Sequence, residues 1–83
     1  MKRPEILRMM GDILERQGRA ADVLQDSATI RDIKFRSLDF SELCLRVETT
    51  IGKELNFEAA DLRAIQTVGD VCTFIEKAQP DAS

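Results

Sequence analysis

Apolar residues recur at spacings of three and four residues in three separate stretches of the chain, whereas alternating apolar and polar residues are weak throughout. This spacing puts side chains on one face of an α-helix and does not suit a half-buried strand. A chain of 83 residues holds one small core, which compact helix packing buries more readily than a sheet does. The periodicity therefore predicts an all-α fold.

The first periodic stretch begins at Pro4, which suits the first turn of a helix, and Gly18 gives a stop after Gln17. We therefore predict a helix over residues 4–17. From Arg19 to Arg36 the spacing fits no regular element, and so long a loop is usually functional or partly structured. We expect its apolar side chains to hold it against the core; these are Val23, Leu24, Ile30 and Ile33.

Helical spacing returns at Ser37 and stops at Gly52, with Phe40, Leu43, Cys44, Val47 and Ile51 on one stripe. A short helical piece is predicted over residues 59–64, burying Leu62 with Ile65 just beyond.

Thr67 is expected to cap the last helix, with Asp70 accepting from the first turn. The apolar face of this helix is Val68, Val71, Phe74 and Ile75, and Pro80 lies beyond its end. The sequence thus predicts a small all-α bundle of three main helices plus one short helix, with a long loop between the first and second helices. We interpret residues 1–83 as a single domain with a structured core over about residues 4–78.

The composition excludes several classes of function. With no histidine, the chain lacks the usual general base and the commonest zinc ligand. Cys44 and Cys72 are too few for a zinc site and are expected to be small core residues, although the sequence leaves a disulfide open. We therefore expect that the chain is not an enzyme.

The charge and the hydropathy exclude further classes. A net charge of −3 argues against nucleic-acid binding. Without a transmembrane run or a signal-peptide core, we expect a soluble, cytoplasmic, monomeric protein that spans no membrane.

The helix that begins at Ser37 has more apolar surface than its core stripe requires. Leu38 and Leu45 lie seven residues apart on another side, close to the acidic residues Asp39, Glu42 and Glu48. One interpretation is a docking face for a partner with an apolar cleft and a basic rim. The other is that Leu38 covers the end of the core and Leu45 is an ordinary surface leucine.

Ser37 lies where the long loop becomes this helix, and it also has two interpretations. Serine is a preferred N-cap, so its hydroxyl can simply satisfy a backbone donor. A helix N-terminus also favours a phosphate attached or bound there. The other candidate hydroxyls, Ser27 and Ser41, are interpreted as ordinary polar residues.

Two motifs resemble the acyl carrier protein family. Arg36, Ser37, Leu38 and Asp39, followed by Glu42 and Leu43, are similar to the family motif Asp-Ser-Leu-Asp-x-x-Glu-Leu. The segment 65–71 is similar to the family's Ile-x-Thr-Val-Gly-Asp entry into the last helix. The resemblance covers nearly the whole chain, and the predicted order of helices is the family's order.

This resemblance implies a carrier with 4′-phosphopantetheine attached covalently to Ser37 by a phosphopantetheinyl transferase that uses coenzyme A. Acyl groups would be held on the arm as thioesters, and the partners would be the transferase and the acyl-loading and condensing enzymes. The positions that would face these partners are Leu38, Asp39, Glu42, Leu45 and Glu48.

The sequence departs from the family pattern at three places. Ser41 stands at the apolar position between Leu38 and Leu45, and Arg36 stands where the family has an acid before the serine. Lys34 and Phe35 replace a small or Gly-containing lead-in. These departures favour a carrier for specialised fatty acid or polyketide-type biosynthesis. A peptidyl carrier domain and an unmodified helical protein-interaction module are the alternatives. The sequence does not identify the acyl cargo or the pathway.

Overall fold

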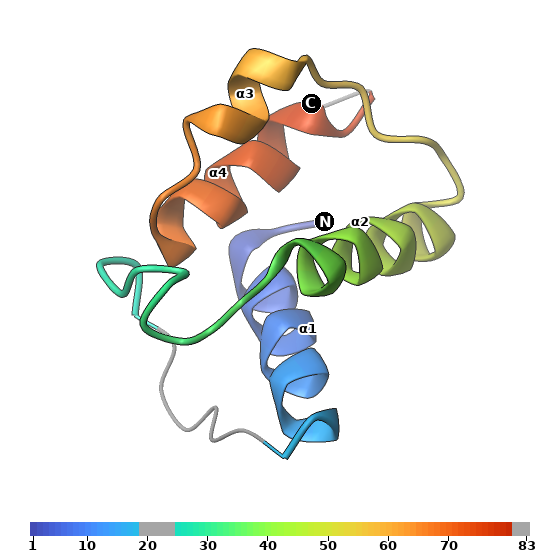
Figure 1. The fold of residues 1–83 in the computed structure, drawn as a ribbon. Coiled ribbons are helices and arrows are strands. Elements are labelled where there is room, and N and C mark those ends of the chain that lie inside the picture. Colours follow the sequence, from blue (N-terminus) through green and yellow to red (C-terminus); the bar gives the residue numbers. More distant parts are fainter. Residues whose placement is uncertain (19–24, 81–83) are drawn as a thin grey trace.

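The computed structural model describes residues 1–18 and 25–80. This part of the chain contains no β-strand and four helices: α1 (Arg3–Arg16), α2 (Ser37–Ile51), α3 (Ala59–Arg63) and α4 (Val68–Ala78) (Figure 1). The prediction of an all-α fold with three main helices, one short helix and a long first connection is confirmed. The first helix lies one residue earlier than the predicted 4–17.

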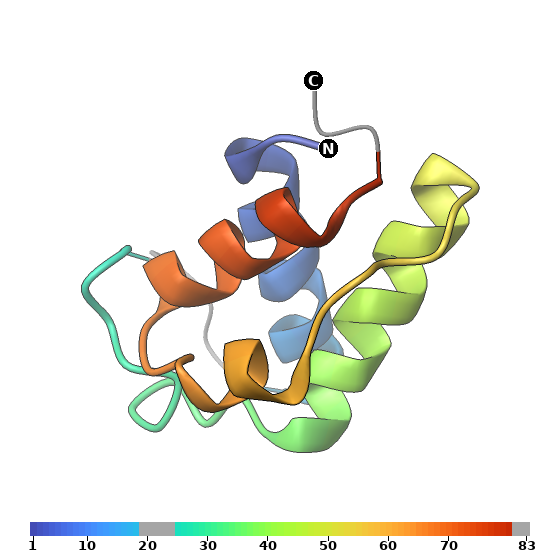
Figure 2. The same ribbon diagram turned by 90° about the horizontal axis from the view of Figure 1, so that it is seen from above.

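The core lies among the three main helices, because α1 packs against both α2 and α4 (Figures 1 and 2). Its buried side chains come mainly from the apolar stripes found in the sequence. They are Ile6, Met10, Ile13 and Leu14 of α1, Leu43 and Val47 of α2, and Val68, Val71, Cys72, Phe74, Ile75 and Ala78 of α4. Removal of these faces from water is the main force that holds the helices together.

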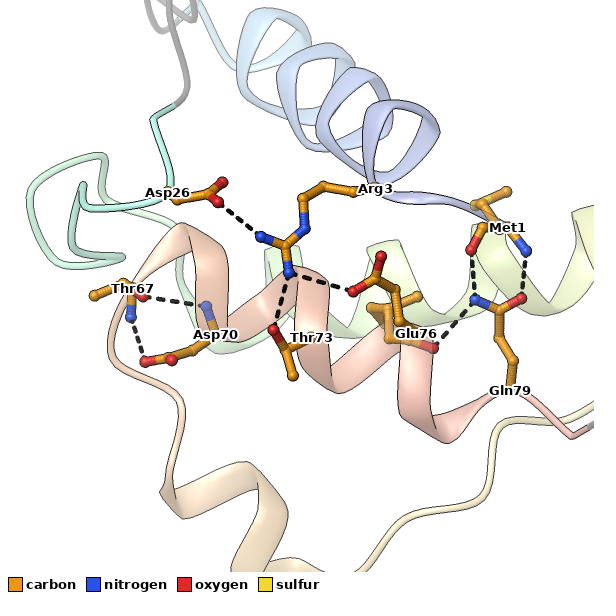
Figure 3. A network of polar contacts seen from close by, with 9 residues as sticks. Met1, Arg3, Asp26, Thr67, Asp70, Thr73, Glu76 and Gln79 are labelled. Atoms are coloured by element: carbon orange, nitrogen blue, oxygen red, sulfur yellow. Dashed lines mark hydrogen bonds and ion pairs between the residues drawn. The ribbon is translucent and has the colours of Figure 1, made fainter. Parts of the chain in front are cut away.

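The ends of α2 and α4 follow from particular residues. Gly52 has a φ of +72°, which only glycine adopts without steric cost, and its N–H donates to the Glu48 carbonyl at 2.8 Å. At the start of α4, the Thr67 hydroxyl accepts the Asp70 N–H at 3.1 Å, and the Asp70 carboxylate accepts the Thr67 N–H at 3.0 Å. The predicted reciprocal cap is therefore confirmed (Figure 3).

The long connection between α1 and α2 is attached to the start of α4. The Ile30 N–H donates to the Gln66 carbonyl at 3.0 Å, and the Val68 N–H donates to the Ala28 carbonyl at 2.8 Å. Ile30 and Ile33 pack against the core as expected, whereas Val23 and Leu24 lie outside the described residues. These contacts fix the path of the chain just before α2.

A polar network joins α1, this connection and α4 (Figure 3). The Arg3 guanidinium lies 2.7 Å from an Asp26 carboxylate oxygen and 3.2 Å from one of Glu76, and it donates to the Thr73 hydroxyl at 2.9 Å. One cation therefore contacts both the connection and α4.

The prediction that the short helix buries Leu62 is wrong, because this side chain is 37% exposed and α3 has no buried residue. A helix of five residues has little more than one turn. The residues on either side of this helix contact the interior instead. Ile65 packs against the core, and the centroid of the Phe57 ring lies 4.9 Å from that of the Phe74 ring.

No helix within the described ranges is long and apolar enough to cross a membrane.

Candidate functional site

Ser37 is the first residue of α2 rather than its N-cap, so the N-cap interpretation of this serine is wrong. The N-cap is Arg36, whose backbone is extended. A guanidinium has no acceptor atom, so Arg36 cannot cap through its side chain. The cap comes from Asp39, whose carboxylate accepts the Arg36 N–H at 2.8 Å.

This arrangement leaves the Ser37 hydroxyl without a structural task. The side chain is exposed, and it makes no hydrogen bond within residues 1–18 and 25–80. Thr67 shows the opposite case, because its hydroxyl is engaged by the Asp70 N–H. The first turn of a helix also carries N–H groups without intrahelical acceptors and the positive end of the helix dipole. The site therefore offers an accessible hydroxyl where a negative group is favoured.

Asp39 is 4% exposed, which contradicts the expectation that it faces partners. Besides the Arg36 N–H, its carboxylate accepts a hydrogen bond from the Gln17 side chain just after α1. The reason is the position of the carboxylate three residues after the N-cap, where it accepts the N-cap N–H as Asp70 does for Thr67. Asp39 is thus a structural residue that positions the start of α2.

The apolar side chains of the predicted strip are exposed. Leu38 is 82% exposed and Leu45 is 63% exposed, and Ser41 between them is exposed as well. Leu38 directly follows Ser37, so a partner that reaches the serine meets this leucine. The interpretation of Leu38 as a cover for the core is not supported, since a covering side chain would be largely buried.

The remaining acids of the predicted docking side are bound to groups of the same chain. Glu42 lies between two arginines, 2.8 Å from the Arg46 guanidinium and 3.2 Å from that of Arg16. Glu48 accepts the Leu55 N–H at 2.9 Å. The two arginines beside Glu42 therefore offset part of the negative charge that α2 presents.

An open groove of about 1050 Å³ lies beside Ser37. Side chains of the first connection, the start of α2, and residues 62–71 line it. Its apolar lining comprises Ile30, Phe35, Phe40, Leu62, Ile65 and Val71, and its charged lining comprises Arg31, Asp32, Lys34 and Arg36. The groove was not predicted, because the irregular connection that forms one wall has no periodic signal in the sequence.

Lys34 and Phe35, the two residues that depart from the family pattern before Arg36, form a turn with a specific backbone conformation. Lys34 adopts a φ of +57°, a left-handed conformation that costs a residue with a Cβ more than it costs glycine. The Phe35 N–H donates to the Ile30 carbonyl at 2.8 Å, and the Phe35 side chain is 5% exposed within the core. Phe35 therefore anchors the turn that presents Arg36 and Ser37.

The two cysteines are free thiols in the structure. Burial raises the pKa of each to about 11, and the charge of Glu48 contributes at Cys44. In the described part of the chain, no group of three or more histidine, cysteine or acidic residues could hold a metal ion.

No family model matches the chain. It is 43% identical over 60 residues to the acyl carrier protein of Sinorhizobium fredii, covering 72% of this chain and 74% of that protein. It is 37% identical over 62 residues to the acyl carrier protein of Chlamydia caviae, covering 72% and 75% of the two chains. The chain belongs to the acyl carrier protein family.

A solved structure supports the fold of this acyl carrier protein independently. The crystal structure of an acyl carrier protein from Thermotoga maritima superposes with a TM-score of 0.68, covering 94% of this chain and 91% of that one at 22% identity. The family resemblance seen in the sequence is thus confirmed.

Proposed function

We propose that this acyl carrier protein holds acyl groups as thioesters on a 4′-phosphopantetheine arm attached to the Ser37 hydroxyl. The observation that carries the proposal is the state of this hydroxyl, which is exposed at the first residue of α2 and released from capping by Asp39. Ser27 and Ser41 are also exposed, but neither lies at the start of a helix.

The surroundings of Ser37 fit such an arm. A phosphodiester at the start of α2 would meet the unpaired N–H groups and the positive end of the helix dipole. The groove beside the serine has polar groups along its edge and apolar side chains from Phe35, Phe40 and Ile65 inside. It could therefore shelter part of the arm or of an apolar acyl chain.

Attachment joins the Ser37 oxygen to the phosphorus that bears the pantetheine group and breaks the pyrophosphate bond of coenzyme A, releasing adenosine 3′,5′-bisphosphate. We assign the base for the serine proton to the transferase, because the chain has no histidine and the nearby Asp39 carboxylate is buried and bound to the Arg36 N–H. Such an arm would supply a terminal thiol on which an acyl group is held as an activated thioester for successive enzymes.

The proposed partners are the phosphopantetheinyl transferase and the acyl-loading and condensing enzymes. Leu38 and Leu45 supply the apolar contact, and Glu42 and Glu48 lie beside it. Because the residues before Ser37 depart from the family pattern, we assign the carrier to specialised fatty acid or polyketide-type biosynthesis. We interpret residues 1–83 as one carrier domain.

The test combines loading with a check of the fold. Apo protein is incubated with an acyl-coenzyme A and a broad-specificity transferase, and the acylated product is followed by mass and by release with hydroxylamine, which cleaves thioesters. Wild type and Ser41→Ala should be loaded, whereas Ser37→Ala should keep its helical circular dichroism and stay unloaded. A wild-type chain that accepts nothing would favour an unmodified interaction module instead.

A peptidyl carrier would differ in its cargo rather than in its attachment site. Loading by an adenylating enzyme that activates amino acids, and none by acyl-loading enzymes, would favour that alternative.

A further inference from the structure

The edge of the groove beside Ser37 carries three cations and one acid. We call Arg31, Lys34 and Arg36 the basic rim; Asp32 is the acidic residue among them. All three cations are exposed. Arg31 and Arg36 make no hydrogen bond or ion pair through their side chains within the described ranges. Two guanidinium groups therefore face solvent around the proposed attachment site.

The acids of α2 do little to offset this charge. The Asp39 carboxylate is 4% exposed and bound to the Arg36 N–H, so it contributes to the cap rather than to the surface. Glu42 is shared between two arginines, and Glu48 lies about three helical turns beyond Ser37 along α2. The surface nearest Ser37 is consequently positive, although the whole chain has a net charge of −3.

We propose that the basic rim binds partner enzymes that carry carboxylates around the entrance to their active sites. This inference rests on the proposed function, because it concerns enzymes that must reach an arm on Ser37. Arginine forms paired hydrogen bonds with carboxylates, whereas a lysine- or arginine-lined entrance would be repelled by the rim. Arg36 directly precedes Ser37, so the surface of an enzyme that acts on Ser37 lies close to the basic rim.

A protein surface fits the site better than a free anion does. Leu38 follows Ser37 and is 82% exposed, so the same approach brings an apolar side chain into contact as well as the rim. The expected partner surface is therefore an apolar cleft for Leu38, edged on the groove side by aspartate or glutamate.

The experiment reverses the charge of two residues of the basic rim and measures whether loading by the transferase becomes slower or faster. Each phosphopantetheinyl transferase of the source organism is assayed for kcat/KM toward wild type and Arg31→Glu/Arg36→Glu at low and high NaCl. Arg8→Glu/Lys77→Glu is the matched control, because it changes net charge equally at exposed residues of α1 and α4 outside the groove. Circular dichroism verifies that both variants fold.

With the transferase that loads wild type most rapidly, the rim variant should lose about tenfold in kcat/KM at low salt, the usual scale of electrostatic steering. The loss should shrink at high salt, and the control should stay near wild type. A rim variant that is loaded faster than wild type, or no more slowly than the control, overturns the inference. The endpoint mass separates the two proposals: wild type that reaches full loading without a rim effect overturns only this inference. If wild type is not loaded at all, the proposed function fails, and this inference fails with it.

Discussion

The Asp39 carboxylate accepts the backbone N–H of Arg36 at 2.8 Å, and Ser37 and Leu38 lie between them in the chain. This contact closes the start of α2 without the Ser37 hydroxyl. Capping and attachment can therefore be served by different residues: Asp39 fixes the helix end, and Ser37 stays accessible on it.

Asp39→Ala should lower the free energy of unfolding by about 2 kcal/mol, because it removes an N-terminal cap and a charged acceptor. The change also removes the contact with Gln17, which links α2 to the end of α1. Urea unfolding followed by circular dichroism measures the loss. Glu54→Ala, at an exposed position, is the control and should change stability by less than about 0.5 kcal/mol. Equal stability of the two variants would contradict the structural role of Asp39.

Asp70 should make the free energy of unfolding depend on pH in the acid range. Hydrogen bonds from the Gln66 N–H at 2.9 Å and the Thr67 N–H at 3.0 Å hold the pKa of Asp70 below its usual 3.8. Because the pKa is lower in the folded protein than in the unfolded chain, the ionised Asp70 carboxylate stabilises the fold. This stabilisation is complete at pH values above the pKa of the unfolded chain, and it is lost as the pH falls through the pKa of the folded protein.

Unfolding in urea at a series of pH values from 7 down to 2 tests this linkage. Asp70→Asn should be less stable than wild type near neutral pH, and the difference should shrink below pH 4. Glu54→Gln is the control. A difference that stays constant with pH would show that the Asp70 charge is irrelevant.

The two protein thiols should react slowly. Because burial raises the pKa of Cys44 and Cys72 to about 11 from 9.0, the thiolate fraction at pH 8 falls about a hundredfold, and alkylation by iodoacetamide should slow in proportion. The same chain in urea is the reference. Equal rates in the folded and unfolded protein would contradict the burial. A thiol on an attached arm would react faster, so the reagent also distinguishes the two kinds of thiol.

Gly52→Ala should destabilise the protein by about 1 kcal/mol, because a φ of +72° is strained for a residue with a Cβ. Apart from the glycine and its two chain neighbours, no heavy atom lies within 4 Å of the added Cβ, so the loss reflects the backbone conformation. Gly52→Asn should lose less, since asparagine tolerates this region better. Thermal unfolding compares the three proteins, and an alanine variant as stable as wild type would rule out this explanation.

The helix boundaries were predictable where a local residue determines them. Gly52 ended α2 at the expected place because its conformation is available to few other residues, and Thr67 with Asp70 formed the expected reciprocal cap. The sequence correctly placed Ser37 at the start of α2, but the interpretation of this serine as the N-cap was wrong, because Arg36 is the N-cap. The acid three residues after the N-cap, the same spacing as that of Thr67 and Asp70, was the available signal that Asp39 accepts the Arg36 N–H.

The groove and the exposure of Leu62 could not be read from local patterns. Both depend on where the irregular connection and a five-residue helix settle against the core, which tertiary contacts such as the bond from the Ile30 N–H to the Gln66 carbonyl decide. Motif similarity could locate Ser37 and Arg36 beside it, but not the groove that Arg31 and Lys34 line.

The most direct test of the account is the position of the arm. Apo protein is incubated with coenzyme A and a broad-specificity transferase, digested with protease and sequenced by tandem mass spectrometry. We predict that one phosphopantetheinyl group is added and that its fragment ions assign it to Ser37. A group found on Ser27 or Ser41, or none at full incubation with each available transferase, would contradict the account.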